Sequence, residues 1–157
     1  MGTRYRGSTE QVLALDVYIK LMRASDAVAN RVHSHLKAVN LTVSQFGVLE
    51  ALLHLGPLSQ SQLAQKLLKS GGNMTLVIDN LQKRGLIERV RSNTDRRTIS
   101  VHLTEAGRKL IERVFAPHVE QIVSALAVLS EAERHTLGQL CRKLGLAQKD
   151  NGNNQIF

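Results

Sequence analysis

The fold of this chain is decided by residues 63–107, which read LAQKLLKSGGNMTLVIDNLQKRGLIERVRSNTDRRTISVHLTEAG. This stretch contains two amphipathic helices separated by a glycine-containing turn, and then two short apolar strands separated by a polar, basic loop. We expect the helices at residues 63–67 and 73–84 and the strands at residues 86–90 and 98–103. A helix pair followed by a basic hairpin predicts a winged helix-turn-helix, in which one helix enters a DNA groove and a charged loop lies beside it.

Positive charge is concentrated in the predicted hairpin. The chain has 157 residues and a formal net charge of +8, and residues 83–97 hold six basic and two acidic side chains, a net +4. On its own such a run would be a solvated surface. Within a wing it favours DNA, because each neutralised phosphate releases counterions. The low aromatic content, 3% with no Trp, argues against a reader of RNA or single strands, which stack bases on aromatic rings.

Long apolar stripes lie on both sides of this unit. Apolar residues recur at spacings of three and four from Val12 to Val39, which predicts a helix of about 45 Å if it is continuous. A second stripe follows residue 104; we expect Pro117 to kink or interrupt it and Gly145 to end its last helix. A compact domain of this size cannot cover such stripes from within, so we expect a second copy of the chain to bury them.

The resulting fold class is mainly α with a small β-hairpin wing, a winged helix-turn-helix with long N- and C-terminal dimerisation helices. We expect a single domain over residues 1–157. Its parts are dimerisation helices at residues 9–40 and 104–145, the winged helix-turn-helix at residues 44–103, and a disordered polar tail at residues 146–157. A twofold dimer would present two recognition helices, which suits a pseudo-palindromic site with half-sites about 10 bp apart or more.

The chain carries no pattern that indicates export or a membrane. Residues 1–10 are polar and do not read as a signal peptide, and no apolar run is long enough to cross a bilayer. The single cysteine, Cys141, excludes an intrachain disulfide. We therefore expect a soluble, cytoplasmic protein with no membrane contact.

Three sequence segments carry a family resemblance. Leu41–Leu49 reads LTVSQFGVL, Asp95–Arg97 reads DRR and Val101–Gly107 reads VHLTEAG. The first resembles the opening of the second helix, and the other two the wing signature, of the MarR family of bacterial transcriptional regulators. The order of elements also matches, from Thr9 to Gly145. The resemblance implies a homodimer that binds double-stranded operator DNA, usually as a repressor, and is released by a small phenolic or lipophilic ligand or by oxidation of a cysteine.

The helix that begins near Ser70 is the expected reader of the major groove. Its N-terminal amides carry partial positive charge, and Gly71 and Gly72 would let the backbone approach DNA, although a plain turn explains them equally well. Short polar side chains on the same helix could reach base edges. The expected DNA-binding residues are Ser59, Ser70, Gly71, Gly72, Asn73, Thr75, Asn80, Lys83, Arg84, Arg89, Arg91, Asp95, Arg96 and Arg97.

The predicted wing supplies the strongest of these contacts. By resemblance, Arg97 enters the minor groove, whose negative potential favours an inserted arginine. Asp95, two residues earlier, can hold that guanidinium in a bidentate pair. Arg89, Arg91 and Arg96 are expected to meet phosphates. The alternative is a solvent-exposed hairpin with an ordinary surface ion pair.

By resemblance, a small-molecule effector binds between the dimerisation helices and the DNA-binding lobe. The candidate lining residues are His33, Leu36, Phe46, Leu49 and Val114, which could equally form plain core. Within the family, residues 69–75 and 80–86 resemble the recognition region of a subgroup that responds to electrophiles, quinones and other stress compounds.

A redox or zinc response is the alternative mode of regulation. Cys141 could sense oxidants, but it lies on an apolar stripe with Leu140 and Leu144, where a cysteine is usually inert packing. His33 and His35 are two apart on a helix and so face different sides, and none of the six histidines shows the spacing of a helical zinc site. We therefore expect no metal and no cofactor.

Two other functional classes fit the sequence less well. An enzyme would need catalytic groups, and the sequence shows no Ser-His-Asp pattern, no phosphate-binding glycine motif and no metal-ligand spacing. A winged helix that binds protein rather than DNA is the other alternative. Salt distinguishes the two kinds of binding, because DNA affinity falls steeply as salt rises.

Overall fold

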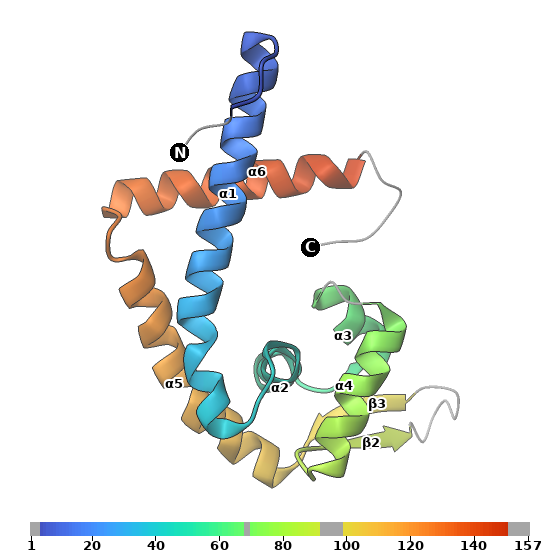
Figure 1. Cartoon of the computed structure of the whole chain (residues 1–157). Coiled ribbons are helices and arrows are strands. Elements are labelled where there is room, and N and C mark those ends of the chain that lie inside the picture. Colours follow the sequence, from blue (N-terminus) through green and yellow to red (C-terminus); the bar gives the residue numbers. More distant parts are fainter. Residues whose placement is uncertain (1–3, 68–69, 92–98, 151–157) are drawn as a thin grey trace.

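The protein is mainly helical, with one small antiparallel sheet (Figure 1). The computed structural model describes residues 4–67, 70–91 and 99–150. The helices are α1 (Thr9–His33), the 3-10 helix η1 (Ser34–Val39), α2 (Val43–Leu55), α3 (Gln60–Lys66), α4 (Gly71–Lys83), α5 (Glu105–Leu126) and α6 (Glu131–Asp150). The strands are β1 (Leu58–Ser59), β2 (Ile87–Arg91) and β3 (Ile99–Leu103). The predicted order of a long helix, a helix pair, a hairpin and two closing helices is confirmed.

Hydroxyl side chains start the helices of the lobe where the sequence predicts. Thr42 Oγ1 accepts a hydrogen bond from the backbone N of Gln45 at 3.1 Å, and the Gln45 side chain accepts one from the backbone N of Thr42 at 3.0 Å. Ser59 and Gln62 form the same reciprocal pair at the start of α3. Such caps are each worth about 1 kcal/mol, so local sequence sets the boundaries of the helix-turn-helix.

The sheet has the strand order β1–β3–β2, with both pairings antiparallel. β2 and β3 form the predicted hairpin, in register from Ile87 opposite Leu103 to Arg91 opposite Ile99. The third strand, β1, corrects the predicted two-stranded wing. It contributes only two residues, which pair with Ser100 and Val101 of β3. A strand this short shows no alternation of apolar and polar residues, so the sequence pattern does not reveal it.

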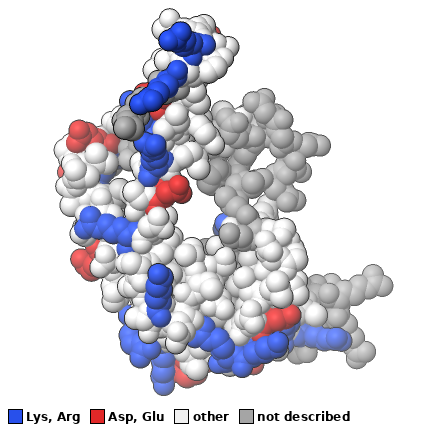
Figure 2. Space-filling model, in the orientation of Figure 1, with Lys and Arg blue, Asp and Glu red and all other residues white. Residues whose placement is uncertain are grey.

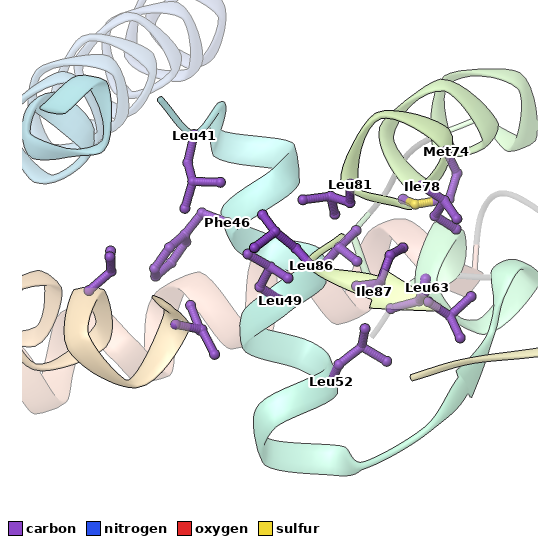
Figure 3. Packing of buried hydrophobic residues seen from close by; sticks show 14 of the residues in the cluster. Leu41, Phe46, Leu49, Leu52, Leu63, Met74, Ile78, Leu81, Leu86 and Ile87 are labelled. Atoms are coloured by element: carbon purple, nitrogen blue, oxygen red, sulfur yellow. The ribbon is translucent and has the colours of Figure 1, made fainter. Parts of the chain in front are cut away.

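One hydrophobic cluster holds together the lobe formed by α2, α3, α4 and the sheet (Figure 3). Met74, Ile78 and Leu81 recur along α4 at helical spacing and are fully buried. Leu49 of α2 and Ile87 of β2 enter the same cluster. Burying a side chain of this size stabilises the fold by about 1.5–3 kcal/mol. The inner face of α4 therefore fixes its orientation and leaves the opposite face to the solvent.

Two long helical arms extend from this lobe. α5 packs along α1, and α6 continues from the end of α5 at the far side of the molecule from the sheet (Figure 1). Along α1 only Val32 is buried, and no side chain in the described part of α6 is buried. Large apolar side chains such as Leu13 and Leu140 are therefore exposed on both arms.

Two of the long helices end differently from what was expected. α1 ends at His33 and the chain continues as a 3-10 helix to Val39, whereas one α-helix was predicted. α5 is continuous at Pro117, so the interruption expected there as one alternative is absent, while the other alternative, a kink, stays a prediction. α6 runs past Gly145 to Asp150, so residues 146–150 of the expected tail are helical, and residues 151–157 lie outside the described residues. A glycine inside a helix costs only about 1 kcal/mol, and the Leu, Ala, Gln and Lys that follow Gly145 are good helix formers.

The described helices were also compared with the dimensions of a lipid bilayer. Across residues 4–67, 70–91 and 99–150, no single helix has both the length and the hydropathy of a membrane span. One pair of segments, Thr9–Val39 with Val43–Leu55, passes on length and composition together, but it bends by 86° at the break.

Candidate nucleic-acid interface

The outer face of α4 forms an exposed stripe opposite the buried one. Asn73, Leu76, Asn80 and Lys83 recur at spacings of three and four, and all four are exposed. Three of them are polar or basic residues that the sequence assigned to DNA. The fourth, Leu76, was missed, although it is 64% exposed in the middle of the stripe. The signal was present in the sequence, because Leu76 falls outside the inner apolar stripe of its helix.

The start of α4 is open to an approaching phosphate. Ser70 Oγ accepts a hydrogen bond from the backbone N of Asn73 at 3.4 Å and so fixes where the helix begins. Gly71 and Gly72 form the first turn, and a Cβ added to either would meet no atom within 4 Å. The first amides of a helix have no partner within the helix and carry partial positive charge, so this end suits an anion.

Thr75 and Ser59, both expected at the DNA, also hold the two helices in place. Thr75 Oγ1 donates to the carbonyl oxygen of Gly71 at 3.1 Å and accepts from Gln60 Nε2 of α3 at 2.6 Å. Ser59 Oγ accepts from the backbone N of Gln62 at 3.3 Å and lies 3.0 Å from Ser61 Oγ. The Thr75 hydroxyl therefore already has two partners, and its structural role is to join α3 to α4.

Arg89 joins the first strand of the wing to α4. Its Nη2 lies 2.5 Å from Asp79 Oδ1, and its Nη1 donates to Gln82 Oε1. A half-exposed ion pair of this kind adds roughly 0–1 kcal/mol to stability. The pair matters more for the position of β2, because the Arg89 guanidinium holds this strand against two residues of α4. The phosphate contact predicted for Arg89 would have to compete with these bonds.

Arg84, predicted to contact DNA, also has partners within the chain. Its Nη1 donates to the carbonyl oxygen of Asn40 at 2.7 Å, and longer contacts of 3.5 Å reach the Val39 carbonyl oxygen and Gln45 Oε1. These partners precede it by about 40 residues, so no local pattern indicates them. A phosphate contact by Arg84 would have to compete with these bonds, and the DNA contact stays a prediction.

The remaining charged residues that were predicted to contact DNA divide into two groups. Lys83 and Arg91 are exposed at the end of α4 and at the end of β2. Figure 2 shows Lys and Arg side chains in a row along the lower edge of the molecule, where η1, the start of α5 and the end of α4 lie in Figure 1. Asp95, Arg96 and Arg97 lie outside the described residues, so their roles stay predictions.

A surface hollow of about 810 Å³ lies where α1 and η1 meet the start of α2. Its lining residues are Ala29, Asn30, His33, Ser34, Leu36, Lys37, Leu41, Thr42 and Val43. His33 and Leu36 were predicted to line an effector site and do line this hollow. Phe46, Leu49 and Val114, predicted with them, are not among its lining residues and belong to the hydrophobic core, to which Leu36 also contributes.

His33, which lines the hollow, forms a cluster of three histidines with His35 and His118. The ring of the buried His118 on α5 lies 5.6 Å from that of His33, 5.3 Å from that of His35 and 4.3 Å from that of Phe46, measured between centroids. Burial lowers the pKa of His118, and the nearby His35 and His33 lower that pKa further, so its neutral form is favoured. In the described part of the chain no group of three or more His, Cys, Asp or Glu residues could hold a metal ion.

The prediction that His33 and His35 face different sides was wrong. Two residues along an α-helix are about 160° apart, whereas in a 3-10 helix they are about 120° apart. Because η1 begins at Ser34, both rings can reach His118. His118 itself was not selected from the sequence; it follows Ile111 and Val114 at helical spacing on the buried face of α5.

Cys141 is exposed in this chain, although we expected it within apolar packing. It does lie on α6 with Leu137, Leu140 and Leu144, but those leucines are themselves exposed. The expected burial of this face is therefore not provided by the chain's own residues.

Comparison with known proteins places this architecture. The MarR family model matches residues 41–99, which run from the turn before α2 to the start of β3. The transcriptional regulator MhqR of Bacillus subtilis is 32% identical over 136 residues, 87% of this chain and 94% of that protein. The chain belongs to the MarR family. The resemblance read from the sequence is thereby confirmed, and this MarR-family protein is a DNA-binding transcriptional regulator.

Further relatives support the same assignment. The transcriptional repressor MprA of Escherichia coli K12 is 38% identical over 84 residues, 54% of this chain and 48% of MprA. The solved structure of BpsR from Bordetella bronchiseptica has a TM-score of 0.75 and 30% identity, and the match covers 91% of this chain and 98% of BpsR. MprA is a transcriptional repressor, and the BpsR structure concerns the regulation of DNA binding, so the sequence and the fold support the same assignment.

Proposed function

We propose that this MarR-family protein is a homodimeric repressor that binds a pseudo-palindromic operator and leaves it when a small acidic aromatic ligand binds. The observation that carries the proposal is the exposed face of α4, which presents two Asn side chains and a Lys beside an open helix start. A helix of this kind fits the major groove, and Asn is suited to the edge of adenine. The similarity to the repressor MprA supports repression rather than activation.

The homodimer is supported by the apolar side chains that the arms leave exposed. Leu13, Val17 and Tyr18 on α1 and Leu140 and Leu144 on α6 are all exposed in the single chain. Exposed apolar area of this extent marks an interaction site on a soluble protein. A twofold axis would cover both arms with equivalent surfaces and bring two copies of α4 to successive turns of the duplex.

The ligand class is argued from the lining of the hollow. Of its apolar lining residues, Val43 is exposed, whereas Leu36 and Leu41 are also part of the core; Lys37 and His33 supply one cation and one imidazole ring. This combination suits an aromatic ring that carries a carboxylate or phenolate. BpsR, whose DNA binding is regulated by 6-hydroxynicotinic acid, supports the same chemistry. A ligand in the hollow would contact α1, η1 and α2 together and shift their spacing if it prefers one arrangement.

The proposal is tested by selecting bound duplexes from a random pool and measuring affinity for the selected operator over a range of salt concentrations. We expect a steep loss of affinity with salt, and release on titration with 6-hydroxynicotinic acid or a related aromatic acid. Lys37→Met should weaken that release without changing operator affinity in its absence. Selection of no sequence, or salt-insensitive binding to a protein instead, would refute DNA recognition. Release by a quinone or a peroxide alone would point to Cys141.

Leu76 is expected to read the methyl group of thymine. It stands between Asn73 and Asn80 on the outer face of α4, and apolar contact in the major groove recognises the thymine C5-methyl group. We expect Leu76→Ala to weaken operator binding by about 1 kcal/mol. Replacing the contacted thymine by uracil should weaken operator binding by the wild-type protein by a similar amount, and should not weaken binding by the variant any further.

The double replacement makes that prediction specific. If the losses from Leu76→Ala and from thymine-to-uracil exchange simply add at every operator position, Leu76 contacts no thymine methyl group. Fluorescence anisotropy with the four combinations of protein and duplex measures this coupling.

A further inference from the structure

Arg84 ties the end of the recognition helix to the turn between the arm and the lobe. It is the C-cap residue of α4, and its Nη1 donates to the Asn40 carbonyl oxygen at 2.7 Å. Asn40 ends η1 in the left-handed conformation, with φ of 52°. The bond therefore joins α4 to the one described non-glycine residue with positive φ, in the break across which the chain bends by 86°.

The same turn forms part of the wall of the hollow. Lys37, Leu41 and Thr42 line the hollow on both sides of Asn40 in the sequence. Gln45 Oε1 accepts from the Thr42 backbone N at 3.0 Å and also lies 3.5 Å from Arg84 Nη1. One face of the turn thus meets the hollow while its carbonyl oxygens hold the recognition helix.

Arginine suits this junction for two reasons. The planar guanidinium offers several N–H donors in a fixed geometry, so its bonds to neighbouring carbonyl oxygens also fix its orientation. A cation at a helix C-terminus is also stabilised by the helix dipole. Because α4 is a rigid helix packed by its inner face, a displacement of its C-cap changes the direction of its outer face as well.

We propose that Arg84 is a positioning residue that couples the turn at Val39–Thr42 to the orientation of α4, so that occupancy of the hollow is transmitted to the DNA-binding face. This inference rests on the proposed roles of α4 and of the hollow. It assigns Arg84 no contact with DNA. Its effect on operator affinity runs through the angle of α4.

Variants at two adjacent basic residues separate positioning from phosphate contact. Arg84→Ala removes the bond to the turn. Arg84→Lys keeps the positive charge but removes the planar set of guanidinium donors. Lys83→Ala removes the exposed charge of the neighbouring residue. We expect both Arg84 variants to bind the selected operator about tenfold more weakly, because α4 is then held less firmly in the orientation that fits the operator. Their affinity for random duplex and their salt dependence should stay as in the wild type.

The matched control is expected to behave differently. Lys83→Ala should weaken binding to operator and random duplex alike and lower the salt slope by about 1, as for a lost phosphate contact. If Arg84→Ala behaves like Lys83→Ala and Arg84→Lys restores full affinity, Arg84 contacts phosphate and the proposal is wrong. Wild-type operator affinity in Arg84→Lys refutes the proposal on its own, even if Arg84→Ala fails to fold.

Hydrogen exchange measures the coupling directly and needs no ligand. In the wild type the amide of Asn40 donates to the Lys37 carbonyl and that of Leu41 to the Leu36 carbonyl. We expect operator DNA to slow exchange in this turn as well as in α4, because coupling between two sites is reciprocal. In Arg84→Lys the slowing in the turn should be lost and that in α4 retained.

Two outcomes distinguish the inference from the function on which it rests. If the wild type binds no duplex, DNA recognition itself fails. If it binds operator but exchange in the turn is unchanged, or changes equally in Arg84→Lys, DNA recognition stands and the coupling through Arg84 is refuted.

Discussion

We expect Gly107→Ala to lower the free energy of unfolding by about 3 kcal/mol, at the upper end of the usual cost of overpacking. Gly107 lies in the first turn of α5, where its amide donates to Thr104 Oγ1 at 3.0 Å. A Cβ at this position would meet the carbonyl oxygen of Leu86 at less than van der Waals separation, at 1.9 Å. That oxygen also accepts from the backbone N of Thr104 at 3.2 Å, so it cannot move without breaking the junction of α5 with β2.

Gly72→Ala is the matched control for this substitution. An added Cβ there meets no atom within 4 Å, and alanine is the better helix former by about 1 kcal/mol. Denaturant unfolding of both variants at one protein concentration measures the difference. If Gly107→Ala is as stable as the wild type, the close approach of α5 to Leu86 is not a constraint on the fold.

The helices of the lobe were predictable because their signals are local. A hydroxyl residue followed three positions later by Gln marks the starts of α2 and α3, and periodic apolar residues mark the inner face of α4. These signals act within four residues of chain, so they read the same in the sequence as in the fold. The residues of α4 that do not belong to its buried apolar stripe form its outer face, and this face makes up most of the candidate site.

The features that were missed depend on contacts between distant residues. Arg84 was assigned to DNA by its charge, because its acceptor at Asn40 lies 44 residues away. His118 meets His33 and His35 only because α5 packs along α1 and α1 tightens into a 3-10 helix. β1 is too short to carry a pattern of its own. Each of these features is set by packing between elements, so a sequence pattern along one element does not reveal it.

Leu140→Glu is expected to dissociate the proposed homodimer and to weaken operator binding by about 100-fold or more, the gain that linking two binding units typically provides. Leu140 is 59% exposed near the middle of α6, in a helix that buries none of its described side chains within its own chain. A carboxylate placed on an apolar contact with a second copy would have to be desolvated without a partner. The lobe has its own core and should stay folded, with one α4 per molecule in place of two.

Gln139→Glu adds the same charge one residue away, and so about 100° around the helix from Leu140. It is exposed as well, and it should leave both the dimer and operator affinity close to wild type. Analytical ultracentrifugation gives the oligomeric state, and anisotropy on operator and half-site duplexes gives the affinities. The comparison is decisive because a lost dimer should abolish the advantage of the full operator over the half-site. If Leu140→Glu remains dimeric with that advantage intact, α6 does not form the interface, and its exposed leucines require another partner.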